Sequence, residues 1–222
     1  MTRLLIVRHG ETVFNRERRF QGWLDVPLSD LGSAQARACA GYLARSPFIP
    51  VARVYSSPLG RAEQTARAIA EALGVDLATD ERLREIDVGK IIGMTWQDVA
   101  DEYPQLMEEY RRNPAAIRYP GGESVLDVSN RAGDLLRWIA EAHQRETVAV
   151  VGHAIILKAL ICHILRLDVP NYRRMTLGNA SLSVAEVDVS TGGLGGKVIR
   201  LNDRHYLECA GLDAYTGEAD AR

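Results

Sequence analysis

Two short apolar runs, each followed at once by a histidine, constrain the fold of this chain more than any other feature. Leu4–Val7 leads directly into Arg8-His9-Gly10, and Thr147–Val151 leads into Gly152-His153. Branched apolar runs of this length are typical of strands buried on both faces, as in parallel sheets covered by helices. If both strands are central and parallel, the two imidazoles leave the sheet at the same edge, where ligands of α/β folds usually bind.

Segments typical of strands and helices alternate along the rest of the chain. Strands are expected at 3–8, 51–56, 147–151, 180–189 and 197–201, and helices at 30–45, 58–73, 95–112 (broken at Pro104), 123–143 and 154–166. Ser57-Pro58 is a candidate N-cap with proline at the first helical position, residues 11–28 are expected to form a polar loop, and the glycine-rich run 192–197 a hairpin turn. The alternation predicts an α/β three-layer sandwich, with a mostly parallel central sheet and helices on both faces. We expect a single domain over 1–210 and a polar C-terminal tail over 211–222.

Composition excludes several classes of protein and partner. The 27 Lys+Arg and 29 Asp+Glu leave a net charge of −2, so no overall positive field points to nucleic acid or to an anionic membrane. The three cysteines, Cys39, Cys162 and Cys209, are scattered, which argues against a disulfide framework and for a reducing compartment. The first apolar run is too short for a signal peptide, and no run approaches a membrane helix. We therefore expect a cytoplasmic protein with a small-molecule partner; a homodimer is left open.

The five histidines divide into two groups. His9 and His153 could be a buried, hydrogen-bonded pair with a purely structural role. Their matching positions at strand ends, beside Arg8, favour a functional role instead. His153 also stands at a helix N-terminus, which favours anions. His143 is interpreted as a solvated helix end, His163 points away from His153, and His205 lies in a late loop.

Motifs for metals and nucleotides are not found. No His-x-x-x-His pair or carboxylate cluster has metal spacing, so no metal and no cofactor is expected. The run 192–197 has the wrong spacing for a phosphate loop, and Val198 stands where Ser or Thr is needed.

An ordered set of short motifs resembles the histidine phosphatase superfamily, also called the phosphoglycerate mutase-like family. The matches are the nucleophile segment over 5–12 with Asn15, the substrate loop and first helix over 19–32, the second arginine motif over 55–66, the acid motif over 83–89, and the short motifs 121–124, 150–153 and 179–181. The sequence departs from the family motifs at two places, and both leave the identity of the substrate open. Lys90–Gly93 stands where the family often has Trp followed by Glu-Gly, and Ala154 stands where it often has glycine.

The resemblance implies a role for each site residue. Neutral His9 would attack phosphorus and form a phosphohistidine, with its second ring nitrogen donating to a backbone carbonyl. Glu85 would give its proton to the leaving oxygen and later take one from water. The implied catalytic residues are His9, Glu85, Arg8, Arg61 and a protonated His153. The implied substrate-binding residues are Arg8, Asn15, Gln21, Gly22, Arg61, Glu85 and Ala154.

Three functions stay open. The leading hypothesis is a metal-independent phosphatase of small phosphomonoesters, and the second is a cofactor-dependent phosphoglycerate mutase. The third is a protein that binds a phosphorylated ligand without catalysis. It is disfavoured because all five implied catalytic residues are present. Only residues 86–119 separate Glu85 from Pro120. The resemblance implies a longer, site-closing insertion in mutases, so this short segment favours a more open, water-accessible pocket and hydrolysis. The natural substrate is beyond the sequence.

Overall fold

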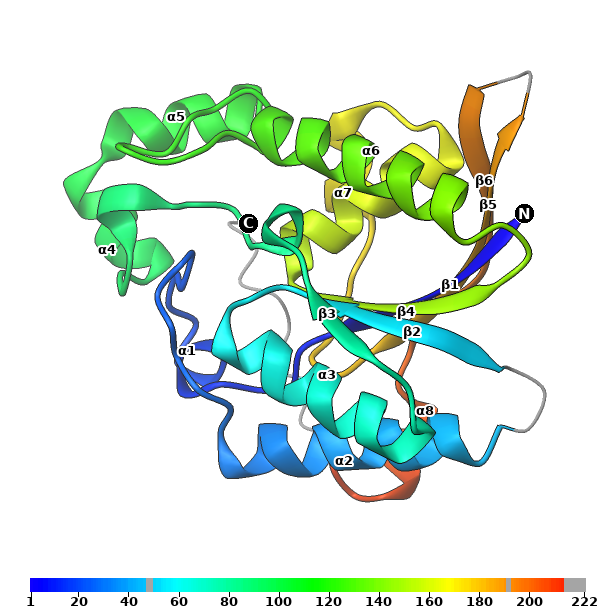
Figure 1. Cartoon of the computed structure of the whole chain (residues 1–222). Coiled ribbons are helices and arrows are strands. Elements are labelled where there is room, and N and C mark those ends of the chain that lie inside the picture. Colours follow the sequence, from blue (N-terminus) through cyan, green and yellow to red (C-terminus); the bar gives the residue numbers. More distant parts are fainter. Residues whose placement is uncertain (47–49, 191–192, 214–222) are drawn as a thin grey trace.

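A six-stranded sheet runs through the middle of the computed structural model, which describes residues 1–46, 50–190 and 193–213 (Figure 1). Its strand order is β3-β2-β4-β1-β5-β6. β1 to β4 are parallel, whereas β5 and β6 run antiparallel to their neighbours. The strands are β1 Thr2–Arg8, β2 Val51–Ser56, β3 Leu77–Thr79, β4 Thr147–Gly152, β5 Leu182–Ser190 and β6 Gly193–Asp203. The expected mostly parallel α/β sheet is confirmed.

Helices cover both faces of the sheet, α2 and α3 on one side and α6 and α7 on the other (Figure 1). The α-helices are α1 Val13–Arg16, α2 Asp30–Ala44, α3 Gly60–Leu73, α4 Trp96–Glu102, α5 Pro104–Arg112, α6 Val125–Ala142, α7 Ala154–Leu165 and α8 His205–Cys209; 3₁₀ turns are η1 Glu81–Leu83, η2 Gly89–Ile91 and η3 Val169–Arg174. Ser29 and Ser124 cap α2 and α6, and Gly74 ends α3 in the left-handed conformation.

The two central strands are apolar throughout because each of their faces meets a separate helical layer. In β1, Leu4 and Ile6 pack with α6 and α7, whereas Leu5 and Val7 pack with α2 and α3. Every residue of β4 is buried. Each fully buried side chain of this size contributes about 1.5–3 kcal/mol. The two strands that lead into His9 and His153 are therefore anchored in the core on both faces.

Helix α3 begins two residues later than the sequence predicts. Ser57-Pro58 was expected to open it, but the N-cap is Leu59, without a side-chain hydrogen bond. The Oδ1 atom of Asp25 instead accepts from the Gly60 amide at 2.8 Å. The Ser57 hydroxyl accepts from the Leu59 amide at 3.2 Å and also lies 2.8 Å from Nε2 of His153.

Two expected loops contain regular structure. The polar segment 11–28 includes the short helix α1, which Thr12 and Asn15 open with a capping box. Residues 193–196 of the glycine-rich run begin β6 and are not a turn; residue 192 lies outside the described residues. A Cβ on Gly196 would meet the Glu186 carbonyl oxygen at 1.9 Å, so glycine is needed there for strand pairing. Of the expected tail, residues 214–222 also lie outside the described part.

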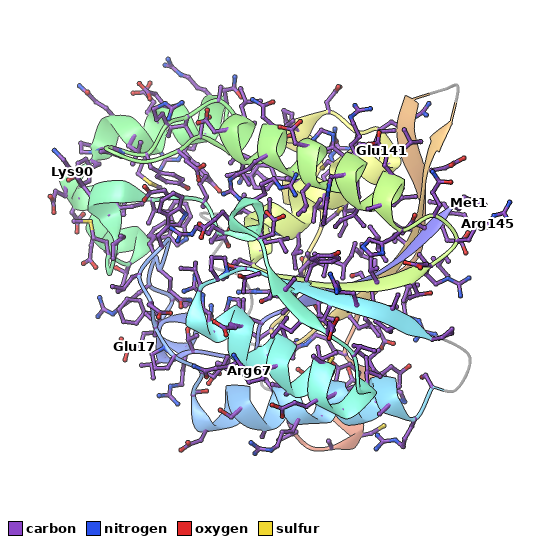
Figure 2. The ribbon with its side chains drawn as sticks, viewed as in Figure 1. Met1, Glu17, Arg67, Lys90, Glu141 and Arg145 are labelled. Atoms are coloured by element: carbon purple, nitrogen blue, oxygen red, sulfur yellow. The ribbon has the colours of Figure 1, made fainter. Side chains whose placement is uncertain are left out.

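Charged side chains of both signs lie on the outside of the molecule. Figure 2 shows this for Glu17, Arg67, Lys90, Glu141 and Arg145. Within the described residues, none of the helices has the length and apolar character that a membrane span requires.

Candidate active site

His9 and His153 leave the sheet side by side, as the strand pattern predicts. β1 and β4 are paired in parallel with Arg8 opposite Gly152. The His9 amide donates to the Gly152 carbonyl at 3.0 Å, which brings the two strand ends into register. The imidazole ring centroids are 5.0 Å apart, with the rings tilted by 59°. Both histidines are buried.

The surroundings of His9 hold its ring neutral and in one tautomer. Nδ1 lies 2.7 Å from the Gly10 carbonyl oxygen, so it must carry the proton that it donates there. Nε2 therefore keeps its lone pair. Burial lowers the pKa of His9 well below its usual value, and the positive charges of Arg61 and Arg8 lower it further. These are the properties of a nitrogen nucleophile at neutral pH.

The surroundings of His153 also favour its neutral form. Burial is the main cause that lowers its pKa, followed by Arg61, His9 and Arg8. Its Nδ1 atom has no hydrogen-bond partner among the described residues. The protonated His153 that the resemblance implies beside a phosphoryl group stays a prediction; the nearby cations alone oppose that charge. An anion between these groups would favour protonation.

Arg61 connects helix α3 to the loop that follows α1. It is the second residue of α3, and its guanidinium donates to the carbonyl oxygens of Gly22 and Leu24, each at 2.8 Å. Burial lowers the pKa of Arg61 to about 10, although Glu85 and Asp25 act in the opposite direction. Arg61 is therefore charged at neutral pH despite an exposure of only 1%.

An asparagine pair holds the backbone around the nucleophile candidate. The capping box of α1 turns Asn15 so that its Oδ1 accepts from the Thr12 amide and from Asn179 Nδ2, both at 3.1 Å. Asn179 Nδ2 also lies 3.1 Å from the carbonyl oxygen of His9. Asn179 belongs to one of the family motifs, but the sequence indicated no contact with His9.

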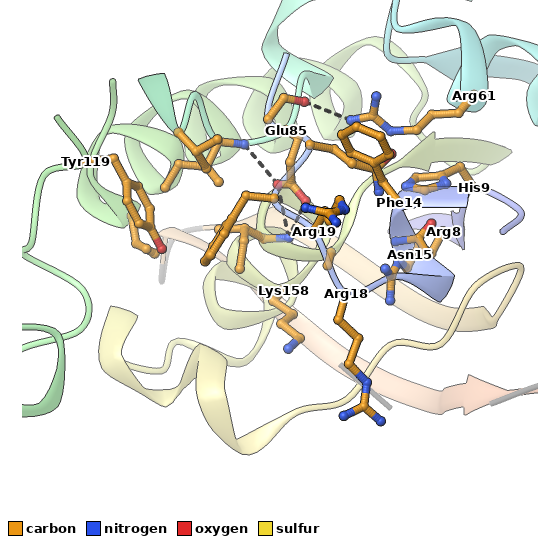
Figure 3. A pocket seen from close by; sticks show the side chains of 18 of the residues that line it. Arg8, His9, Phe14, Asn15, Arg18, Arg19, Arg61, Glu85, Tyr119 and Lys158 are labelled. Atoms are coloured by element: carbon orange, nitrogen blue, oxygen red, sulfur yellow. Dashed lines mark hydrogen bonds between the residues drawn. The ribbon is translucent and has the colours of Figure 1, made fainter. Parts of the chain in front are cut away.

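Glu85 is held against the first turn of α7. Its Oε1 accepts from the backbone amides of Ile86 at 2.9 Å and Ile155 at 3.2 Å. The Glu85 carbonyl oxygen accepts from Trp23 Nε1 at 2.7 Å and from Arg131 at 2.9 Å. Both ends of the residue are therefore fixed, and the carboxylate faces the cavity (Figure 3).

Arg131, on α6, is a positioning residue that the sequence analysis did not find. Besides Glu85, its guanidinium donates to the carbonyl oxygens of Arg82 and Arg84 and forms an ion pair with Glu123 at 3.1 Å. Glu123 in turn accepts from the Asp87 amide at 2.9 Å. Nothing in the local sequence distinguishes Arg131 from a solvated residue of an amphipathic helix.

One cavity of about 180 Å³ contains nearly all the predicted site residues (Figure 3). The predicted residues that line it are Arg8, His9, Asn15, Gln21, Gly22, Arg61, Glu85 and Ala154. His153 touches the His9 ring but is fully buried behind the lining.

The aromatic lining of this cavity was not predicted from the sequence. Phe14 lies beside His9 and Arg61 (Figure 3), and the other aromatic lining residues are Phe20, Trp96, Tyr110, Tyr119 and Tyr172. Segment 86–119, expected to leave the pocket open, folds into α4 and α5 and walls one side with Trp96 and Tyr110. Packing of Phe20 on Trp96, with centroids 4.7 Å apart, fixes this wall. Lys158 could have been noticed in the sequence, because it is a charged residue within the apolar helix α7.

The other histidines lie elsewhere. His143, expected as a solvated helix end, is the C-cap of α6 but is half-buried, with Nε2 2.7 Å from the Tyr55 hydroxyl. His163 Nε2 contacts the Ser129 carbonyl at 2.8 Å, and exposed His205 begins α8, not a loop. In the described part of the chain, no three His, Cys, Asp or Glu side chains gather as a metal site would require.

Several known proteins resemble this chain in sequence or in fold. The model of the histidine phosphatase superfamily (branch 1) matches residues 4–203. Phosphoserine phosphatase 1 of Hydrogenobacter thermophilus is 35% identical over 85% of this chain and 88% of its own. A probable phosphoglycerate mutase GpmB of Salmonella choleraesuis is 35% identical over 96% of this chain and 98% of its own length. The mycobacterial glucosyl-3-phosphoglycerate phosphatase complexed with VO3 superimposes with a TM-score of 0.80 at 30% identity, covering 91% of this chain and 99% of that one.

Proposed function

The chain belongs to the histidine phosphatase superfamily and is a phosphoric monoester hydrolase, and from this premise we propose that it hydrolyses small phosphomonoesters through a phosphohistidine on His9. The observation that supports this most is the state of His9. Its Nδ1 proton is held by the Gly10 carbonyl, and its unprotonated Nε2 belongs to a ring that lines a cavity with Arg8 and Arg61. Residues 1–210 would act as one domain that needs no cofactor.

The proposed reaction has two displacements at phosphorus. In the first, His9 Nε2 forms a bond to phosphorus while the ester oxygen leaves and takes a proton from the Glu85 carboxyl. In the second, Glu85 takes a proton from water, the water oxygen attacks phosphorus, and the N–P bond breaks to restore His9. General acid–base help of this kind contributes about 10²–10⁴-fold to a rate.

Arg8 and Arg61 would bind the phosphoryl oxygens through charge-assisted hydrogen bonds. We propose that the phosphoryl dianion also offsets the cations that keep His153 neutral. His153 then becomes protonated and acts as a further donor. Asn15 and the loop residues Gln21 and Gly22 complete the phosphate end, with Ala154 beside Glu85.

Turnover should survive exhaustive chelation and should be blocked by vanadate, because the two guanidinium groups supply the positive charge that a metal would otherwise provide. The measurement is hydrolysis of p-nitrophenyl phosphate by enzyme dialysed against EDTA, then with vanadate added. Strict dependence on added magnesium or zinc would contradict the proposal.

A mutase is the second candidate function, and the 35% identical probable phosphoglycerate mutase favours it. Both functions use the same histidine, arginines and glutamate, so the difference lies in what attacks the phosphohistidine. A mutase must keep water away and retain a bisphosphate intermediate until it has reacted again. The family comparison of segment 86–119 favours hydrolysis, although its helices wall one side of the cavity.

Supplied with 3-phosphoglycerate and catalytic 2,3-bisphosphoglycerate, the enzyme should release phosphate and form little 2-phosphoglycerate. Phosphate release and isomerisation are to be measured in the same reaction mixture, since their ratio is independent of the active fraction of enzyme. Isomerisation much faster than hydrolysis would overturn the choice of phosphatase.

A further inference from the structure

Strand β6, at the edge of the sheet, contains a bulge close to the end that lies near the cavity. Where β6 pairs with β5, two residues, Leu201 and Asn202, lie opposite the single residue Ser183. Asn202 has a φ of 54°, in the left-handed region that residues other than glycine rarely adopt. Asparagine tolerates this region because its short amide can form local hydrogen bonds. Bulges beside active sites often re-aim a side chain, so the contacts of Asn202 indicate what this bulge does.

Both the backbone and the side chain of Asn202 form hydrogen bonds. Its amide donates to Ser183 Oγ at 3.0 Å, which fixes the bulge to β5. Its Oδ1 atom accepts from the Gly178 amide at 2.7 Å. Gly178 belongs to the loop before β5, and a Cβ on it would meet the Arg204 side chain at 2.8 Å. The bulge and the residue that follows β6 therefore hold loop 177–180 closely.

Loop 177–180 in turn contacts the phosphoryl end of the cavity. The Leu177 carbonyl oxygen accepts from the Arg8 guanidinium at 2.5 Å, in a buried hydrogen bond. The Ala180 amide donates to the His9 carbonyl at 3.0 Å, and Asn179 Nδ2 lies 3.1 Å from the same oxygen. The loop is therefore the layer between the bulge and the two residues of β1 and its end that would meet the phosphoryl group.

We propose that Asn202 is a positioning residue for Arg8. The Leu177 carbonyl and the Gly178 N–H belong to one planar trans peptide group, so they point in opposite directions. Because Asn202 holds the N–H, it also sets the direction in which the carbonyl meets Arg8. Without this acceptor the peptide group can rotate, and the guanidinium loses the orientation in which it binds phosphoryl oxygens. This inference rests on the proposed function, because it takes Arg8 to bind the phosphoryl group.

The first test is Asn202→Gly, which keeps the left-handed backbone without strain and removes only the side-chain acceptor. For p-nitrophenyl phosphate, kcat/KM should fall about tenfold, a loss of about 1.4 kcal/mol. Asn202→Asp keeps an oxygen in the place of Oδ1, so its kcat/KM should stay within about twofold of wild type. Thermal unfolding of each variant verifies that it is folded at the assay temperature.

A double-mutant cycle with Arg8→Lys separates positioning from a general loss of structure. Lysine has no planar guanidinium for the Leu177 carbonyl to orient. Adding Asn202→Gly to Arg8→Lys should therefore lower kcat/KM by less than about twofold. A purely structural role would instead lower kcat/KM by the same factor in both backgrounds. Calorimetric titration with inorganic phosphate repeats the cycle as binding constants, which do not depend on turnover.

Arg145→Gly is the matched control, because it makes the same change at another left-handed residue, with a φ of 67°. Arg145 is exposed, and its amide donates to the Met1 carbonyl at the opposite end of β1, so kcat/KM should remain that of wild type. The inference is overturned if Asn202→Gly leaves kcat/KM unchanged, if Asn202→Asp does not restore it, or if the two backgrounds show equal losses. A wild-type enzyme that does not hydrolyse p-nitrophenyl phosphate would instead refute the proposed function.

Discussion

Replacing His9 with alanine is expected to lower kcat by at least about 10⁴-fold, because it removes the nitrogen that forms the bond to phosphorus in the proposed reaction. Burial and the charges of Arg61 and Arg8 keep the pKa of His9 low, although its hydrogen bond to the Gly10 carbonyl acts in the opposite direction. That hydrogen bond places the ring proton on Nδ1 and leaves Nε2 unprotonated. The measurement is steady-state hydrolysis of p-nitrophenyl phosphate, with far-UV circular dichroism to verify the fold. His163→Ala is the matched control: this histidine contacts Ser129 outside the cavity lining, so its loss should leave turnover nearly unchanged.

The wild-type enzyme also offers a direct test of the intermediate. Enzyme quenched during turnover of a labelled phosphoester should carry label that is labile to acid and stable to base, the behaviour of a phosphorus–nitrogen bond. His9→Ala should carry none. Acid-stable label on the wild-type enzyme would instead indicate an ester intermediate on a hydroxyl group and would refute the role of His9.

That His9 and His153 leave the sheet at one edge could be predicted from two apolar runs and one rule of sheet topology. The apolar runs before His9 and His153 identify central strands, and parallel strands end at the same edge of a sheet. The 5.0 Å between the two rings also requires β1 and β4 to be direct neighbours in the sheet, which the sequence did not indicate. The presence of Arg61 on the first turn of α3 also follows from the sequence, although the start of that helix was misplaced.

The supports of the site could not be predicted, because they depend on side chains that meet only in the folded chain. Asp25 accepts from the first amide of α3 from 35 residues away, and Ser57 contacts His153 from 96 residues away. Arg131 holds the segment around Glu85 from a helix more than 40 residues later. Such contacts carry no local pattern. The aromatic wall could not be predicted either, because Phe20 and Trp96 come from separate segments that were expected to form a loop and a short helix.

Glu85→Gln should separate the two displacements at phosphorus. Glutamine keeps a side-chain oxygen that can accept from the Ile86 and Ile155 amides, so the geometry should persist while the transferable proton is lost. For an alkyl phosphate such as glycerol 3-phosphate, whose leaving oxygen needs a proton, turnover should fall by about 10²–10⁴-fold. p-Nitrophenolate leaves without that proton, so His9 should still be phosphorylated rapidly. The phosphohistidine should then persist, because no base activates water.

The expected signature is a burst of p-nitrophenol equal to the enzyme concentration, followed by slow steady release, measured by stopped-flow absorbance. The control is Glu81→Gln, which makes the same change at an exposed carboxylate four residues away, paired with Arg84. That variant should show wild-type turnover on both substrates. Equal losses of turnover on the two substrates, without a burst, would mean that Glu85 neither protonates the leaving oxygen nor takes a proton from water. It would then only shape the cavity. A burst in Glu85→Gln that is absent from both Glu81→Gln and wild type would place the slow step at water attack, since in that step the nitrogen–phosphorus bond persists until a base takes a proton from water.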